Sequence, residues 1–113
     1  MTAGCPGEAR AYNRASMQRF FVERRIRDVH ERLVRARKEL AVLEEQYAVV
    51  ADAAEDARLR SLVSETPLAA HEYGEVRRHA DAMARARDAL ISTVVELEHR
   101  RDELLQYIGA KRR

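Results

Sequence analysis

The sequence predicts an all-α protein, a two-helix antiparallel coiled-coil hairpin whose copies dimerise into a four-helix bundle. Two observations predict the hairpin: a heptad pattern of apolar residues along most of the chain, and a single break in it at Pro67. Composition agrees, since 35% of the 113 residues are charged, 5% are aromatic, and there are only 4 Gly and 2 Pro. Few helix breakers and few aromatic residues favour long helices over sheet.

The first predicted helix spans about residues 9–63 and follows a flexible N-terminus at residues 1–8. From Val22 onward, apolar or small residues recur at alternating spacings of three and four, which defines heptad positions a and d from Ile26 on. This set comprises Ile26, Val29, Leu33, Ala36, Leu40, Leu43, Tyr47, Val50, Ala54 and Ala57.

A turn is predicted at residues 64–66. Pro67 cannot continue the first helix and disfavours a helical conformation at Thr66. Thr66 as N-cap and Pro67 as the first helical residue form a helix-start signal. A connection this short favours antiparallel packing of the two helices.

The second predicted helix spans residues 67–109, ends at Gly109 and is followed by a basic tail at residues 110–113. Its seam positions also alternate by three and four, with two arginines among them: Tyr73, Val76, Ala80, Met83, Arg87, Leu90, Val94, Leu97, Arg101, Leu104 and Ile108. With a turn centred on Glu65, residues whose numbers sum to about 130 face each other, for example Leu33 and Leu97. We expect the two arginines to keep their stems on the seam and their charged groups in water, or to pair with acidic groups of a partner.

Several apolar residues lie off this seam, and they predict contact with further helices. We expect a second copy to cover them, with a helix of a different protein as the alternative. The partner-binding candidates are Ile91, Val95, Leu105, Val34, Leu59, Leu62, Val63, Leu68, Glu65, Phe20 and Phe21.

The N-terminal arm around Phe20 and Phe21 is basic and predicted to be helical. It could pack across the base of a dimer, dock a separate protein or lie on a membrane surface, although its apolar residues form no clean amphipathic face.

Charge is distributed unevenly along the chain, although the net charge is only +2. Residues 1–38 hold ten basic and four acidic side chains, whereas residues 39–72 hold two basic and eight acidic ones. Such separation favours a directional interaction or the stacking of two hairpins by opposite ends. It also suggests nucleic-acid binding through the basic end, with these candidates: Arg24, Arg25, Arg27, Lys111, Arg112 and Arg113.

The sequence predicts no catalytic, cofactor-binding or metal site. It has none of the phosphate-binding, dinucleotide-binding or zinc motifs, and Cys5 is the only cysteine. His71, Glu75 and His79 share one helical stripe, but alone they make a poor metal cage. No apolar run of signal-peptide or transmembrane length occurs, so we expect a cytoplasmic protein without a membrane span.

These observations predict a non-enzymatic protein–protein interaction module, a coiled-coil adaptor or regulator of a larger machine such as transcription or secretion. The alternative is a nucleic-acid-associated protein that binds through the basic open end of the hairpin.

Overall fold

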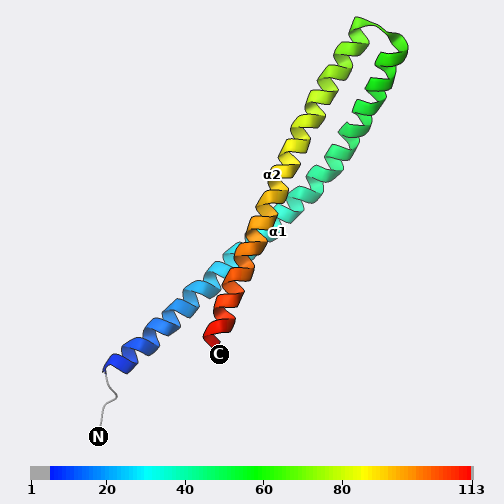
Figure 1. The fold of residues 1–113 in the computed structure, drawn as a ribbon. Coiled ribbons are helices and arrows are strands. Elements are labelled where there is room, and N and C mark those ends of the chain that lie inside the picture. Colours follow the sequence, from blue (N-terminus) through cyan, green and yellow to red (C-terminus); the bar gives the residue numbers. More distant parts are fainter. Residues whose placement is uncertain (1–5, 113) are drawn as a thin grey trace. The chain divides into compact units, whose positions relative to one another are not determined.

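The chain folds into two long helices joined by a two-residue turn (Figure 1). This structure, a computed structural model, describes the backbone of residues 6–112 and the side chains of residues 13–110. Helix α1 spans Pro6–Ser64 and helix α2 spans Pro67–Arg112, and the described residues contain no strand. The predicted all-α helical hairpin is therefore confirmed.

Helix α1 ends in a left-handed cap at Glu65. The backbone N–H of Glu65 donates a hydrogen bond of 3.2 Å to the carbonyl of Ser61, and its φ is 52°. This bond satisfies one of the last carbonyls of the helix, while the positive φ reverses the chain direction. Glycine usually occupies such a position, because a Cβ is strained there.

Helix α2 begins with the predicted cap. The hydroxyl Oγ1 of Thr66 accepts a 3.2 Å hydrogen bond from the N–H of Ala69. The carbonyl of Thr66 accepts the first helical bond from Ala70 at 3.1 Å. Pro67 occupies the first helical position, where its missing N–H costs nothing. The prediction of Thr66 as N-cap is confirmed.

The contacts of the chain divide it into two units, and the turn belongs to the unit of residues 35–95. In this unit every predicted seam residue is buried or half-buried, and the most buried ones are small or β-branched. Ala57 is 3% exposed, Ala36 is 6% exposed, and Ala80 and Val94 are each 8% exposed. The heptad register therefore correctly identifies the face along which α1 and α2 pack.

The other unit combines residues 1–34 of the first helix with residues 96–113 of the second. Leu33 is its best-packed side chain, with 0% exposure, followed by Val29 at 4% and Leu97 at 8%. Full burial of a leucine stabilises a fold by about 1.5–3 kcal/mol. Leu33 and Leu97 are paired by the same register, so their burial supports a pairing centred on Glu65 in this unit too.

The two arginines on the seam stay accessible at their tips. Arg87, in the unit of residues 35–95, is 30% exposed and bonds Asp88 at 3.2 Å, while its guanidinium lies 4.7 Å from the ring centre of Tyr47. Arg101, in the other unit, is 29% exposed and bonds Asp102 at 3.2 Å. Each arginine therefore forms an ion pair with the aspartate that follows it in sequence.

The helix ends differ from the predicted ones. Helix α1 begins at Pro6, three residues before the predicted start at residue 9, while the prediction for residues 1–5 lies outside the described residues. Helix α2 continues through Gly109 to Arg112, because Gly109 has no positive φ to end it and Ala, Lys and Arg are good helix formers. The predicted tail at residues 110–113 is thus helical as far as Arg112.

Candidate functional site

The candidate functional features of the described side chains all lie on the surface of the two helices. No polar or charged side chain among them is buried, and no group of three His, Cys, Asp or Glu residues among them could hold a metal ion. His71 contacts Glu75 at the surface, with Nε2 and Oε1 3.3 Å apart. Helical spacing alone therefore accounts for this pair.

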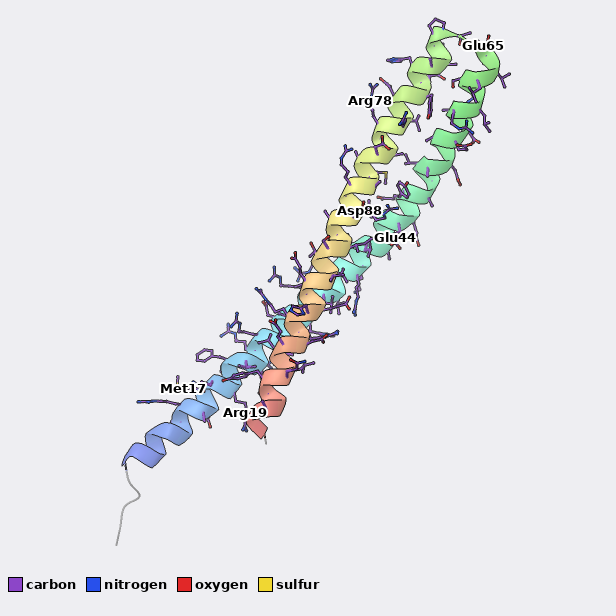
Figure 2. The ribbon with its side chains drawn as sticks, viewed as in Figure 1. Met17, Arg19, Glu44, Glu65, Arg78 and Asp88 are labelled. Atoms are coloured by element: carbon purple, nitrogen blue, oxygen red, sulfur yellow. The ribbon has the colours of Figure 1, made fainter. Side chains whose placement is uncertain are left out.

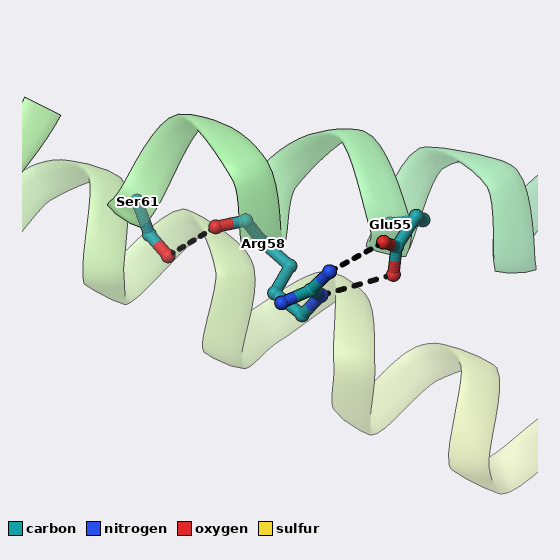
Figure 3. Close-up of polar contacts among 3 residues, drawn as sticks. All are labelled: Glu55, Arg58 and Ser61. Atoms are coloured by element: carbon teal, nitrogen blue, oxygen red, sulfur yellow. Dashed lines mark hydrogen bonds and ion pairs between the residues drawn. The ribbon is translucent and has the colours of Figure 1, made fainter. Parts of the chain in front are cut away.

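One bidentate ion pair shifts the pKa of its members. Arg58 donates hydrogen bonds of 2.6 and 3.0 Å to the two carboxylate oxygens of Glu55, three residues earlier in α1 (Figure 3). These bonds lower the pKa of Glu55 and raise that of Arg58. Ser61 donates to the Arg58 carbonyl at 2.7 Å in the same region. Both side chains are solvent-exposed, so the pair is a surface ion pair.

Large apolar side chains are exposed on both helices, and they form the most distinctive surface feature of the chain. Among the described residues, the large apolar ones with at least 39% exposure are Met17, Phe20, Phe21, Val42, Val49, Leu59, Leu62, Val63, Leu68, Ile91, Val95, Leu105 and Tyr107. Single exposed apolar residues are ordinary, but clusters of them mark interaction surfaces.

The first cluster, the turn patch, consists of Leu59, Leu62, Val63 and Leu68 in the unit of residues 35–95. Their exposures range from 48% to 86%, with Val63 the most exposed. Glu65 lies between them in sequence and is exposed at the turn itself (Figure 2). All of these were predicted as partner-binding candidates, and they flank the turn in sequence, at the end of α1 and the start of α2.

The second cluster, the α2 stripe, consists of Ile91 and Val95 in the same unit. Their exposures are 39% and 59%. They lie one helical turn apart, and Ile91 shares the seam-flanking heptad position e with half-buried Ala84, two turns earlier on α2. Ile91 and Val95 therefore widen the apolar surface of α2 beyond the seam. Charged residues also lie on α2; Figure 2 shows one of them, Arg78, on the side of the helix that faces away from α1.

The third cluster, the aromatic patch, consists of Met17, Phe20 and Phe21 on α1 in the unit of residues 1–34 and 96–113. The two phenylalanine rings lie edge to face, with centres 5.9 Å apart, and all three side chains are more than half exposed. A shallow surface hollow of about 420 Å³ continues from this patch along the helix; it is lined by Phe20, Arg24, Arg27, Asp28 and Glu31.

Two further hollows lie beside the seam. In the unit of residues 35–95, an open groove of about 530 Å³ is lined by Leu43, Gln46, Val49, Val50, His79 and Met83. In the other unit, a smaller hollow of about 90 Å³ is lined by Ala15, Gln18, Arg19, Tyr107 and Ile108. Both are largely apolar and open to solvent, so each suits a side chain of a neighbouring helix better than a small substrate.

The other partner-binding and basic-end candidates differ in how exposed they are. Leu105 is 50% exposed, whereas Val34 is half-buried. Among the basic-end candidates, Arg24, Arg25 and Arg27 are exposed, and the side chains of Lys111, Arg112 and Arg113 lie outside the described ones. Within residues 6–112, no helix has both the length and the apolar character needed to cross a membrane.

Sequence reasoning missed Val42, Val49 and Tyr107 as candidates. Val42 and Val49 are 54% and 69% exposed and lie seven residues apart on α1. Both occupy heptad position c, outside the seam positions a and d. Inspection of the outer heptad positions could have identified them.

Comparison of the chain with protein-family models, with curated proteins and with solved structures finds no match.

Proposed function

We propose that this chain is a non-enzymatic protein–protein interaction module, an adaptor or regulator that binds another helical protein surface. One observation carries the proposal: large apolar side chains are exposed on a hairpin outside the seam along which its own two helices pack. Covering such clusters is favourable, because each large apolar side chain removed from water contributes about 1.5–3 kcal/mol.

The turn patch and the α2 stripe belong to one unit and suit helix packing. In the α2 stripe, Ile91 occupies heptad position e, which flanks the seam and becomes core when two hairpins form a four-helix bundle, and Val95 lies one turn further along the helix. Small side chains at Ala41 and Ala48, both exposed on α1, would allow close approach of a neighbouring helix. We therefore propose that two hairpins associate into a four-helix bundle.

Affinity capture from the native host with mass spectrometry tests the proposal. The bait is the full chain, compared with the double variant Ile91→Glu/Val95→Glu and with Ser92→Glu, which changes an exposed polar residue of the same helix. We expect the double variant to lose the proteins captured by the parent chain, the chain's own copies included, and Ser92→Glu to retain them. Equal capture by all three baits, with helix content unchanged by circular dichroism, would refute a role for the stripe.

Nucleic-acid binding is the second candidate, because Arg24, Arg25 and Arg27 are exposed close together on α1. Such binding would weaken steeply with salt, as counterions are released when phosphates are neutralised. Replacing the three arginines by glutamine would then abolish binding of duplex DNA in fluorescence anisotropy. Salt-independent or absent binding by the parent chain would exclude this candidate.

A further inference from the structure

One side of α2 carries a second seam, next to the one that packs on α1. It consists of heptad positions e and b, which alternate by three and four and lie on the same flank of a helix. In the unit of residues 35–95 these positions hold Ala70, Gly74, Arg77, Asp81, Ala84, Asp88, Ile91 and Val95. Each of them is exposed or half-buried, so the described part of the chain does not cover this side of α2.

Gly74, on this second seam, has no role inside the hairpin. It lies within α2 and has no positive φ. A Cβ at Gly74 would meet no atom of the described residues within 4 Å, its adjoining residues and helix backbone apart. Alanine would therefore fit the hairpin and form a more stable helix. A glycine in such a place suits the close approach of a second helix.

The two ends of the second seam are complementary when two copies of α2 run antiparallel. One end holds Ile91 and Val95, and the other holds the small residues Gly74 and Ala70. With residue numbers summing to 165, Ile91 of one copy meets Gly74 of the other, and Val95 meets Ala70. Large side chains therefore face small ones at both ends, as close packing of facing helices requires.

The middle of the second seam is charged, and the same register pairs unlike charges there. Arg77 of one copy meets Asp88 of the other, and symmetry forms this pair twice. Within each chain, Arg77 lies 4.0 Å from Asp81, and Arg87 lies 3.2 Å from Asp88. Each copy thus brings two basic and two acidic side chains to the middle of the contact, which leaves no net charge there.

Two features of this register oppose the contact. Asp81 meets Ala84, and the Asp81 side chains of both copies lie near the two-fold axis, where the Arg77 beside each offsets its charge. At the neighbouring position f, Arg78 of one copy approaches Arg85 of the other. Both arginines are exposed at the edge of the contact, so their side chains can separate into solvent. No facing pair of the second seam itself opposes like charges.

Helix α1 of the same unit permits this arrangement. Its pairing with α2, in which residue numbers sum to 130, places residues 47 and 48 level with the centre of the α2 register. Positions e and b near that level include Ala41, Ala48 and Ala51, so two copies of α1 can approach closely. With residue numbers summing to 92, about 2 Å from this level, the facing pairs are Ala41 with Ala51, Glu44 with Ala48, and Arg37 with Glu55.

We propose that a second copy of this chain packs on this side of the hairpin, with the two α2 helices antiparallel and Ile91 of each copy seated over Gly74 of the other. Two-fold symmetry forms each contact twice, as is usual for a homodimer. The proposal rests on the four-helix bundle proposed above and deepens it by naming the register of the two α2 helices.

Charge reversal tests the register through a mixing experiment. One variant carries Arg77→Glu, and the other carries Asp88→Arg. Either variant alone opposes like charges at both symmetric contacts, whereas a mixed dimer opposes unlike charges at both. Any effect of a change inside its own hairpin persists in the mixed dimer, so recovery on mixing isolates the contact. Arg60→Glu and Asp56→Arg are the matched controls, because both residues are exposed on α1 at heptad positions g and c, outside the proposed contact.

Dimer dissociation constants are measured by sedimentation equilibrium, and the mixed dimer is identified by native mass spectrometry. We expect each variant alone to dimerise about 10-fold more weakly than the parent chain, and the equimolar mixture to recover parent-like affinity. The two control variants, alone and mixed, should dimerise like the parent chain.

A bulky residue at position 74 tests the same register independently of charge. Gly74→Leu should weaken dimerisation at least about 10-fold, because the new side chain takes the place of Ile91 from the second copy. Helix content by circular dichroism should stay at the parent level or rise, because leucine is a better helix former than glycine. Ala82→Leu is the control, since Ala82 is exposed at heptad position c of the same helix; it should leave the dimerisation constant unchanged.

Three outcomes would overturn the proposal. A parent chain that stays monomeric while it captures a different protein would reject the second copy as partner and leave the interaction function standing. A parent chain that neither dimerises nor captures a protein would reject both. A parent dimer with no recovery in the mixture, or with the same affinity after Gly74→Leu, would reject this register and leave the dimer standing.

Discussion

Truncation of Leu33 to alanine tests the packing of the seam, because Leu33 is the side chain with 0% exposure. Leucine-to-alanine changes at fully buried sites cost about 2–5 kcal/mol. A two-helix seam has half-buried neighbours that can relax into the space, so we expect a value of about 2–3 kcal/mol, in the lower half of that range. Since small domains are stable by about 5–15 kcal/mol, this is a large fraction of the total.

The assay is urea denaturation followed by far-UV circular dichroism at one fixed protein concentration, because association makes apparent stability depend on concentration. Val42→Ala is the control, since Val42 is 54% exposed and its truncation should change the free energy of unfolding by less than about 0.5 kcal/mol. Equal effects of the two truncations would refute the assigned seam.

A double-mutant cycle then tests the register. The register opposes Leu33 to Leu97, so their truncations should be coupled by more than about 0.5 kcal/mol. Leu104 lies seven residues, about 10 Å, further along α2, so its truncation should add to that of Leu33 without coupling. Stronger coupling of Leu33 to Leu104 than to Leu97 would shift the pairing by a heptad and contradict a turn centred on Glu65.

The turn and its neighbourhood support three further predictions. Glu65→Gly should raise the melting temperature, with a gain of up to about 1 kcal/mol, because it relieves the positive φ of 52°; a lower melting temperature would contradict the cap. Thr66→Ala should cost about 1 kcal/mol, because it removes the acceptor of the Ala69 N–H, while Thr66→Ser should retain most of the stability. Arg58→Ala should raise the pKa of Glu55 toward its ordinary value of 4.5 in an NMR titration. Because this pKa is lowered in the folded chain, the pair's contribution is present above pH 4.5 and is lost as the pH falls through the folded value; an unchanged Glu55 titration in the variant would contradict the pair.

Much of the fold follows from local sequence rules. Pro67 and Thr66 locate the turn because capping chemistry and a missing N–H act within a few residues. The seam follows from heptad spacing because a helix of 3.6 residues per turn places positions a and d on one face. Each predicted seam residue, including Arg87 and Arg101, is buried or half-buried in the structure.

Other features depend on interactions that spacing does not encode. A glutamate with positive φ at position 65 carries no sequence signal, because glycine or asparagine usually takes such a place. The contact of Arg87 with the Tyr47 ring depends on the rotamers of two long side chains. Helix α2 continues beyond Gly109 because a glycine can adopt the left-handed conformation that ends a helix but can also stay helical.

The central claim of this account is that the exposed apolar clusters are covered by a second hairpin. Size-exclusion chromatography with multi-angle light scattering on the full chain, over a range of concentrations, tests it most directly. We predict a molar mass that approaches about 26 kDa, twice the 13.0 kDa of one chain. A molar mass of 13.0 kDa at every concentration would contradict the claim.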